Sequence, residues 1–349
     1  MTAPAKAPPV VDLGRRMAAL QPELGEAIDR VVRSGVYLLG PETEAFEAEF
    51  AAFCGRRHAV AVASGTEALR LSLLALGVGP GTEVVVPAFT AVPTAAAVCA
   101  TGAVPVPVDV DAAGAGLDPD LAAGAVSDRT RAVIPVHLYG RPAALPALGV
   151  PVLEDAAQAH GALDPAAPSA AAAYSFYPTK NLGGIGDGGA VVTDDDDLAG
   201  RVRGLRRHGL ADPGTYDHVE VTGNSRLSEL EAAVLRVQLR RLPAWTARRR
   251  AIAAAYRDAA PDLRWQATHE RHVYHLCVAR FVDRDGFRAR APFGTAVHYA
   301  RTITQQTAYR RFARARCPEA ESWAAECVSL PCFPEMTDDE VERVCEALR

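Results

Sequence analysis

The stretch HAVAVASGTEALRLSLLAL, residues 58–76, decides the class of fold because it passes from a strand directly into a helix. Residues 58–63 are small and apolar, as in a buried strand, and residues 67–76 repeat leucine at helical spacing. Between them, Ser64-Gly65-Thr66-Glu67 matches the capping box, in which a serine caps the helix that follows. The stretch therefore predicts a strand whose end meets the N-terminus of a helix.

Strand-like and helix-like stretches continue to alternate beyond this unit. We expect further strands at residues 83–87, 104–108, 132–137, 151–154, 190–193 and 272–279, and helices at 93–101, 119–126, 227–239 and 245–259. Apolar strands alternating with helices are typical of a mostly parallel sheet flanked by helices. The sequence thus predicts an α/β fold, with a large domain at residues 1–240 and a smaller α+β C-terminal domain at residues 241–349.

Charge and composition narrow the class of protein. The net charge of −5 over 349 residues gives no reason to expect nucleic acid or an anionic membrane as partner. The seven scattered cysteines form no CxxC pair, which indicates reduced thiols rather than a zinc or disulfide framework. No apolar run reaches the roughly 18 residues needed to span a bilayer, and the first residues do not resemble a signal peptide. We expect a cytoplasmic enzyme.

The helix start at Gly65 and Thr66 is a candidate anion site. Free N–H groups and the helix dipole converge there, which favours a phosphate. The plainer alternative is that Ser64 simply caps the helix.

A second candidate is Lys180, in the segment YSFYPTKNLGG at residues 174–184. A lysine in a small, aromatic-rich turn can lose its charge and attack a carbonyl carbon. Upstream, PVLEDAAQ at residues 151–158 predicts a strand that ends on Asp155. The alternative for Lys180 is an ordinary surface lysine in a loop.

Together these residues favour one ligand. A phosphate cradle (Gly65, Thr66), a strand-end carboxylate with an amide neighbour (Asp155, Gln158) and a lysine near a serine (Lys180, Ser175) suit a phosphorylated aromatic aldehyde held as a Schiff base. Pyridoxal 5'-phosphate needs this combination, because its ring accepts electrons well when the ring nitrogen is protonated.

Three other patterns favour structural roles. The glycines at residues 183–189 lead into a strand rather than a helix, so we interpret them as turns that let backbone approach the lysine instead of a dinucleotide site. His269, His272 and His275 lack a carboxylate cluster, so no metal site is expected. The basic run at residues 248–250 is interpreted as the solvent face of a helix.

Several motifs resemble those of the DegT/StrS-type sugar aminotransferases, which are fold type I pyridoxal-phosphate enzymes. They are SGTEAL (64–69), EDAAQAHG (154–161), SFYPTKN (175–181) and GNSRL (223–227). The resemblance extends from YLLGPE at residues 37–42 to SLPCFPEMT at residues 329–337, which is nearly the whole chain.

This resemblance implies roles for individual residues. Lys180 would form the Schiff base and move the substrate proton, and Asp155 would pair with the ring nitrogen. Gln158 would contact the ring hydroxyl, and Gly65, Thr66 and Ser175 would hold the phosphate, with Asn224 supplied by the partner subunit of a homodimer. The positions that match the sugar-nucleotide side of the cleft are Tyr37, Tyr177, Arg226, His298 and Tyr299.

The resemblance also implies the reaction. Glutamate would convert the cofactor to pyridoxamine phosphate, which would aminate a keto group, at C3, of a dTDP-linked deoxyhexose in antibiotic amino-sugar biosynthesis. The alternatives are amination at C4 and a non-catalytic pyridoxal-phosphate-binding regulatory protein. Sugar 3-dehydratases that resemble this family have histidine at the position of Lys180. The lysine in this chain therefore argues against dehydratase activity. One position departs from the family, because PAFTAV at residues 87–92 has Ala91 where an aromatic residue usually stacks on the cofactor. Either Phe89 takes over or smaller groups cover the ring.

Overall fold

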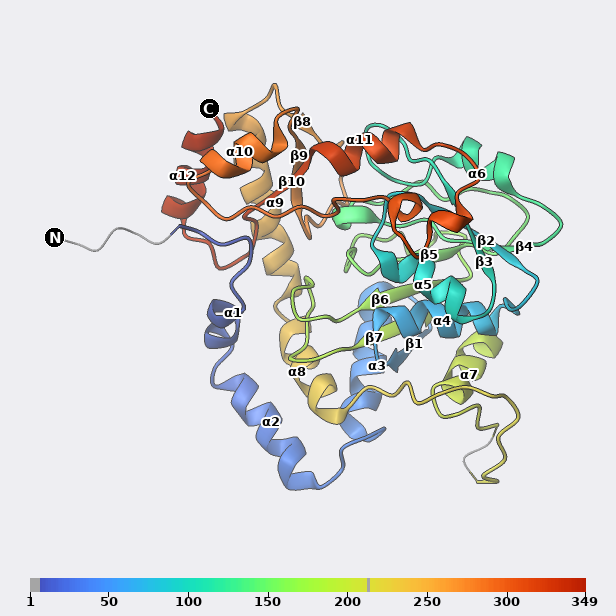
Figure 1. The fold of residues 1–349 in the computed structure, drawn as a ribbon. Helices are drawn as coiled ribbons and strands as arrows, with labels where there is room; N and C mark the ends of the chain where they lie inside the picture. Colours follow the sequence, from blue (N-terminus) through green and yellow to red (C-terminus); the bar gives the residue numbers. More distant parts are fainter. Residues whose placement is uncertain (1–6, 212–213) are drawn as a thin grey trace.

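A central β-sheet lies across the middle of the computed structural model, which describes residues 7–211 and 214–349 (Figure 1). One part has the strand order β1-β7-β6-β5 and the other β3-β2-β4, and parallel bridges from Val133 to Val152 and from Val136 to Asp155 join them. The strands are β1 (His58–Val62), β2 (Glu83–Pro87), β3 (Val104–Val108), β4 (Thr130–Val133), β5 (Leu153–Asp155), β6 (Ala171–Ser175) and β7 (Gly189–Thr193).

The sheet is mostly parallel, as predicted. β2 pairs in parallel with β3 and β4, and β5 with β6, whereas β7 runs antiparallel to both β1 and β6. The reversal at β7 has a local cause, because residues 176–188 between β6 and β7 contain no helix to carry the chain back across the sheet. This connection carries Lys180, and we call it the lysine loop.

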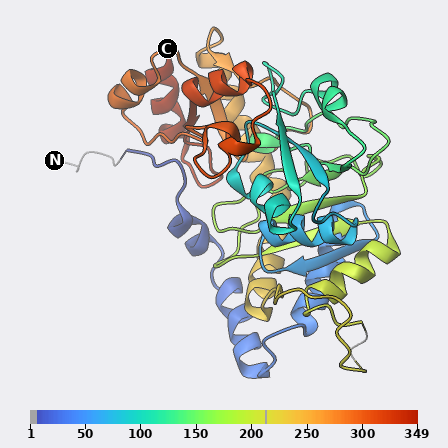
Figure 2. The ribbon, with the colours of Figure 1, turned by 45° about the vertical axis from the view of Figure 1, so that its right-hand side comes forward.

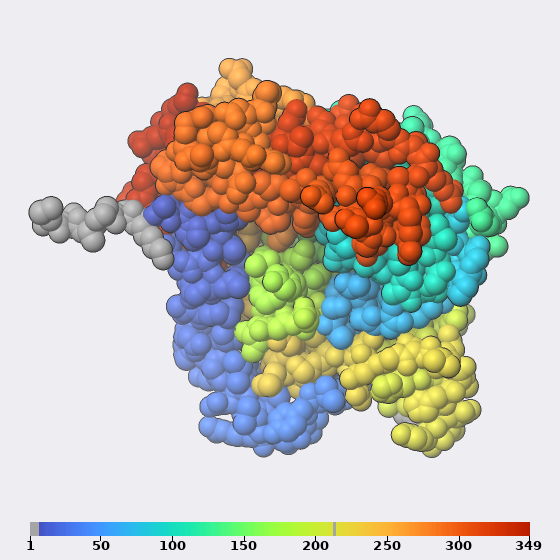
Figure 3. Space-filling model, viewed as in Figure 1, coloured from blue at the N-terminus to red at the C-terminus, as the bar shows by residue number. Residues whose placement is uncertain are grey.

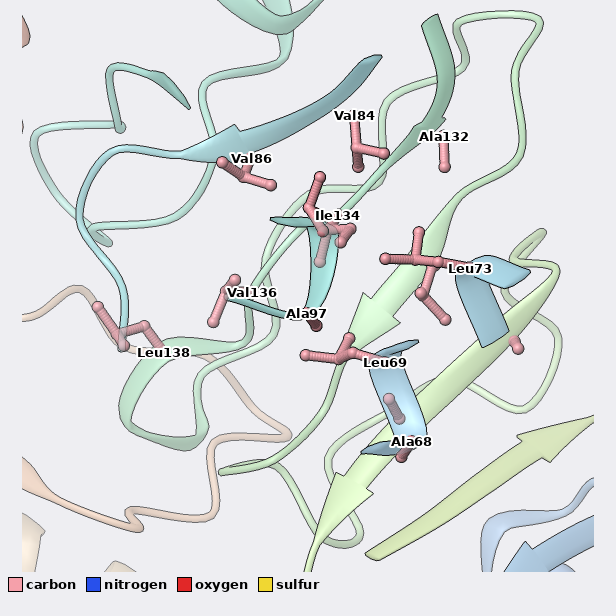
Figure 4. Packing of buried hydrophobic residues seen from close by; sticks show 14 of the residues in the cluster. Ala68, Leu69, Leu73, Val84, Val86, Ala97, Ala132, Ile134, Val136 and Leu138 are labelled. Carbon is pink, nitrogen blue, oxygen red and sulfur yellow. The ribbon is translucent and has the colours of Figure 1, made fainter. Parts of the chain in front are cut away.

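Helices cover both faces of the sheet. They are α3 (Pro41–Cys54), α4 (Gly65–Ala75), α5 (Val92–Ala100), α6 (Pro119–Ala125), α7 (Asp196–Leu205) and α8 (Glu229–Leu239). Successive residues of β1 point to opposite faces: Val60 and Val62 join a core with α4 and α5, and Ala59 and Ala61 join a core with α3 and α8. Figure 4 shows part of the first core, where Leu69 of α4 lies beside Ala97 of α5 and below Ile134.

The C-terminal part contains a smaller antiparallel sheet with the order β10-β9-β8. Its elements are α9 (Leu242–Ala259), β8 (Arg264–Trp265), β9 (Cys277–Arg280), α10 (Arg284–Arg290), α11 (Pro318–Glu326), β10 (Cys327–Leu330) and α12 (Asp338–Leu348), and the short 3-10 helices of the chain are η1 (Leu138–Gly140), η2 (Ile303–Gln305) and η3 (Arg310–Phe312). The division at residue 240 stays a prediction.

The N-terminal helices α1 (Leu13–Ala19) and α2 (Glu23–Ser34) connect the two ends of the molecule. Figures 1 and 2 show the C-terminal part, orange to red, at one end and the blue helices α2 and α3 at the other. The Gly294 N–H donates to the Pro8 carbonyl oxygen at 2.8 Å, so the first described residues pack against the C-terminal part.

Three local predictions need correction. The strand expected at 132–137 is only partly formed: β4 ends at Val133, Pro135 has no N–H to donate, and beyond it Val136 forms a single parallel bridge to Asp155. The strand expected at 272–279 begins at Cys277, because the N–H groups of Val273 and Leu276 donate to the Gly140 and Tyr139 carbonyl oxygens instead of to a neighbouring strand.

The third correction concerns the basic run in α9. Arg249 is not on the solvent face but 2% exposed, and its guanidinium donates to the carbonyl oxygens of Tyr274, His275 and Cys332. Arg248 is half-buried and Arg250 is exposed, so the helix directs only Arg249 into the interior, where its guanidinium bonds the residues before β9 and after β10.

Candidate active site

A cleft of about 500 Å³ opens where the strand ends meet the helix starts. It is lined by the N-terminus of α4, the start of α5, the residues after β5 and the lysine loop. Ligands of such sheets bind at this edge, the carboxyl ends of the parallel strands. The cleft brings together most of the residues predicted from the sequence, namely Gly65, Thr66, Asp155, Gln158, Ser175, Tyr177, Lys180 and Tyr299.

The helix start at Gly65 forms one wall of the cleft. The Ser64 hydroxyl accepts from the Glu67 N–H at 3.1 Å, so the predicted cap is confirmed. The Glu67 carboxylate, however, accepts from Arg70 at 2.7 Å, and the reciprocal bond of a capping box is not formed. The first N–H groups of an α-helix lack partners within the helix, so this wall is suited to an anion.

Gly65 is required by a close approach of two elements. A Cβ at this position would lie 2.6 Å from the Ser175 Cβ, a distance that real Cβ atoms do not show. Gly189 is similarly constrained, because a Cβ there would collide with the Ser64 backbone. Glycine at both positions lets α4 start directly against β6, and the Ser175 hydroxyl thereby lies beside the helix start.

Asp155, at the end of β5, is 5% exposed. One carboxylate oxygen, Oδ2, accepts from the Thr94 hydroxyl at 2.8 Å, and Oδ1 accepts from the Ala157 N–H at 3.1 Å. Burial raises the pKa of Asp155, and the Thr94 hydrogen bond and the nearby Lys180 charge oppose that rise. A buried carboxylate of this kind is stabilised by a protonated nitrogen on a ligand.

Lys180 also lines the cleft, from the lysine loop. Burial lowers its pKa from the ordinary 10.5 to about 8, since the charged ammonium is poorly solvated, and the Asp155 carboxylate partly opposes this effect. A substantial fraction of the amine is therefore neutral near pH 8, which is the state that attacks a carbonyl carbon.

Gln158 is held in one orientation by two neighbours. Its Oε1 accepts from the Tyr139 N–H at 2.6 Å, and its Nε2 donates to the Tyr299 hydroxyl at 3.1 Å. Burial raises the pKa of Tyr299 to about 12, so this phenol stays protonated at neutral pH. The cleft therefore presents a fixed amide next to a neutral phenol.

The glycines at residues 183–189 make several close approaches. A Cβ at Gly183 would collide with the Pro178 carbonyl, so this glycine lets two parts of the lysine loop approach each other on either side of Lys180, as predicted. Gly184 and Gly186 instead pack against Glu231, whose carboxylate accepts from the Ile185 N–H at 3.0 Å. The glycines thus allow close backbone packing as predicted, but two of them do so against Glu231 rather than beside Lys180.

Four predicted residues lie outside this cleft as one chain forms it. Tyr37 is 53% exposed, and Asn224 and Arg226 bond each other, with the Arg226 Nε donating to the Asn224 Oδ1 at 2.8 Å. His298 lines a neighbouring cavity of about 90 Å³ and lies 2.8 Å from the Ser329 hydroxyl through its Nδ1.

The geometry agrees with the alternative in which smaller side chains, rather than Phe89, would cover the cofactor ring. Phe89 is buried with its ring 6.3 Å from that of Trp323, away from the cleft lining, while Ala91, Val92 and Pro93 face the cleft. Among the described residues, the aromatic side chains that line the cleft are Tyr177 and Tyr299.

Several contributors were missed in the sequence. Thr94 bonds Asp155 and also lies 3.0 Å from the Thr90 hydroxyl, and Ala157 and Asp187 line the cleft. The spacing of Thr90 and Thr94, one helical turn apart at a helix start, was a usable signal. His272 and His275 have protein partners, and burial lowers the pKa of His272 to about 3.

Comparison with known proteins places this geometry in context. Residues 19–349 match the model of the DegT/DnrJ/EryC1/StrS aminotransferase family. The chain is 44% identical, over 98% of its length and 95% of the relative's, to a dTDP-3-amino-3,4,6-trideoxy-alpha-D-glucose transaminase of Streptomyces venezuelae. It is 45% identical, over 98% of both chains, to the erythromycin biosynthesis sensory transduction protein EryC1 of Saccharopolyspora erythraea.

Solved structures give the same result. DesV of S. venezuelae, crystallised with a ketimine intermediate, superposes with a TM-score of 0.93 at 43% identity, over 99% of this chain and 98% of that one. NtdA of Bacillus subtilis, with bound cofactor PMP, superposes with a TM-score of 0.94 at 27% identity, over 99% and 85%. None of the helices in the described residues is long and apolar enough to cross a membrane.

Proposed function

The chain belongs to the DegT/DnrJ/EryC1/StrS aminotransferase family, and from this premise we propose that it aminates C3 of a dTDP-linked keto-deoxyhexose. It has the fold type I architecture of pyridoxal-phosphate aminotransferases. The carbon and the nucleotide are supported by two relatives named as dTDP-3-amino-3,4,6-trideoxyglucose transaminases, 44% and 40% identical to this chain. The proposed pathway is antibiotic amino-sugar biosynthesis.

The residues of the cleft fit pyridoxal 5'-phosphate. The helix start at Gly65 and Thr66 lies directly against Ser175, because Gly65 has no Cβ, and its free N–H groups with the Ser175 hydroxyl would hold the phosphate. The buried Asp155 carboxylate would pair with the ring nitrogen, and the fixed amide of Gln158 would contact the ring hydroxyl. When bound, the cofactor supplies an electron sink for the carbon that gains or loses the amino group.

Lys180 is the proposed nucleophile and proton carrier. Its Nζ would bond the cofactor in the resting enzyme and, once released, take a proton from the substrate carbon and return it on the cofactor side. The single observation that carries this role is the position of Lys180 in one cleft with Asp155, Gln158 and Ser175. Burial there lowers the pKa of Lys180 to about 8, which suits a group that accepts and donates a proton. The Asp155 carboxylate would pair with the ring nitrogen and favour its protonated form.

The proposed active form is a homodimer with shared sites. Tyr37, Asn224 and Arg226 lie outside the cleft of their own chain, which agrees with a role in the partner's cleft. Exposed apolar side chains surround the same region, including Val36, Leu38, Tyr177 and Ile185, which are 42–52% exposed. We propose that Asn224 of the partner subunit reaches the phosphate and that Tyr37, Tyr177, Arg226, His298 and Tyr299 contact the sugar nucleotide. The proposed amino donor is glutamate, and the free cysteines support a cytoplasmic location.

Two alternatives are kept for testing. EryC1 and a Geobacillus stearothermophilus relative, 38% identical, carry names of regulatory proteins. The other alternative is amination at C4. A further relative, DesI, was solved with its TDP-sugar product and is 32% identical to this chain. The set of Asp155, Gln158 and Lys180 in one cleft favours catalysis over a purely regulatory role.

The function is tested with the purified holoprotein and a panel of sugars. Glutamate should remove the visible absorption band of the lysine-bound cofactor, and a dTDP-3-keto-deoxyhexose should restore it faster than the 4-keto isomer. Faster recovery with the 4-keto sugar would move the proposal to C4. An unchanged spectrum with every amino donor would support the regulatory alternative.

A further inference from the structure

We propose that Arg16 is a positioning residue for Lys180: by holding the backbone of the lysine, Arg16 sets where the lysine side chain enters the cleft. The inference rests on the proposed role of Lys180. Arg16 belongs to a helix that is 164 positions from the lysine in the sequence. Arg16 lies in α1, which precedes the sheet, and it does not line the cleft.

The contact is made to the backbone of the lysine itself. The Arg16 Nη1 donates to the Lys180 carbonyl oxygen at 2.9 Å and lies 3.4 Å from the Pro178 carbonyl oxygen. In Figure 3 the dark-blue N-terminal segment runs alongside the yellow-green segment that contains the lysine loop. One guanidinium thus bonds both ends of the turn that presents Lys180.

The buried guanidinium is only partly compensated by its neighbours, among them the Trp245 ring, whose centroid lies 5.4 Å from the guanidinium carbon. Arg16 is 1% exposed, and burial together with the nearby Arg249 charge lowers its pKa to about 10. Its ion pair with Glu335 is long, 3.9 Å, and its Nε and Nη2 have no hydrogen-bond partner among the described residues. A well-packed apolar side chain at such a position is often as stable or more so. What the guanidinium adds is a fixed position for the lysine loop.

The lysine loop is held on its other side by Asn181. The Asn181 Nδ2 donates to the Val273 carbonyl oxygen at 3.0 Å, and its Oδ1 lies 3.3 Å from the His275 Nδ1. Arg16 therefore fixes the Lys180 carbonyl, and Asn181 fixes the next residue. With both in place, the direction of the Lys180 side chain is determined by the backbone on either side of it.

The neighbouring arginine provides a matched control. Arg15 donates to both carboxylate oxygens of Glu340 in α12, at 2.7 and 2.8 Å, and its side chain is 39% exposed. Arg15 thus ties α1 to the C-terminal part, whereas Arg16 ties it to the lysine loop. Replacing either one removes one positive charge from the same helix, but only the Arg16 change removes a contact with Lys180.

The test uses the holoprotein and the variants Arg16→Met, Arg16→Gln, Arg16→Lys and Arg15→Met. After borohydride reduction, peptide mass spectrometry measures the fraction of chains that carry the cofactor on Lys180 at each cofactor concentration. Arg16→Met should raise the concentration for half attachment roughly tenfold, as expected for losing a hydrogen bond from a charged donor. It should also shift the midpoint pH of the visible band. Arg16→Lys should recover part of both effects, and Arg15→Met should change neither.

Each outcome separates the inference from the proposed function. Attachment of the cofactor to another residue in the unmodified protein would contradict the proposed role of Lys180. Attachment and midpoint pH that are unchanged in Arg16→Met, or equally changed in Arg15→Met, would overturn the role of Arg16 alone. If Arg16→Met does not fold, as judged by circular dichroism, Arg16→Gln and Arg16→Lys decide by the same measurements.

Discussion

The Thr94 hydroxyl donates a 2.8 Å hydrogen bond to the Oδ2 of Asp155, from the first turns of α5 to the end of β5. Both groups are buried, and Thr94 also lies against the Thr90 hydroxyl at 3.0 Å. The bond fixes the carboxylate and helps to keep it ionised inside the protein, where burial alone would favour the neutral acid. The ionisation of Asp155 therefore depends on α5 as well as on β5, although α5 lies outside the motif EDAAQ.

We expect Thr94→Val to weaken cofactor binding roughly tenfold to a hundredfold, because a buried carboxylate loses one hydrogen bond and its pKa rises further. Thr94→Ser keeps the hydroxyl and should bind nearly as well as the unmodified protein. Equilibrium titration of the apoprotein with cofactor measures both. Equal affinities for the valine and serine variants would show that the hydroxyl has no such role.

Gly65→Ala should weaken cofactor binding by roughly tenfold or more, since the new methyl group would overlap Ser175 and push α4 from β6. The control is Gly200→Ala in α7, where the new Cβ would meet no atom within 4 Å outside the adjacent backbone of its own helix. That change should stabilise the protein by about 1 kcal/mol, because alanine favours a helix more than glycine. Cofactor titration and thermal unfolding measure the pair, and normal cofactor affinity in Gly65→Ala would remove the argument for a tight cradle.

The attachment of cofactor to the apoprotein should depend on pH with a midpoint near 8 rather than near 10.5. The neutral amine is the reactive form, so the rate should rise as the pH increases through the pKa of Lys180. Asp155 raises this pKa by its negative charge, so Asp155→Asn should move the midpoint lower still. Stopped-flow absorbance measures the rates. A midpoint that moves upward in Asp155→Asn would contradict the proposed coupling.

Mixing two inactive variants tests the shared site. In a dimer of Lys180→Ala and Asn224→Ala subunits, one cleft combines both defects and the other is intact. Random mixing should therefore restore about a quarter of the sites, provided that the homodimer is symmetric. Transaminase assays after subunit exchange measure the recovery, with each variant alone as the control. If exchange is shown by mass spectrometry and activity does not return, Asn224 does not act in the partner's cleft.

Much of the fold followed from local patterns. The expected strand at 104–108 coincides with β3, and the expected helix at 119–126 differs from α6 by one residue. β6 was missed because Ala171, Ala172 and Ala173 have no strong strand preference. Arg249 was predicted on the solvent face because three successive arginines usually indicate an exposed helix face. Its side chain is buried instead, among carbonyl groups of residues distant in sequence.

By itself, the sequence determined the α/β class, the Ser64 cap and the candidate set around Lys180 and Asp155, because periodicity, capping and strand-end positions are properties of neighbouring residues. Only the tertiary structure decided how those residues are held. Thr94 and Asp155 are 61 positions apart, and Arg16 and Lys180 are 164 apart. Such contacts depend on how helices pack against the sheet, and packing joins residues whose local patterns carry no information about each other.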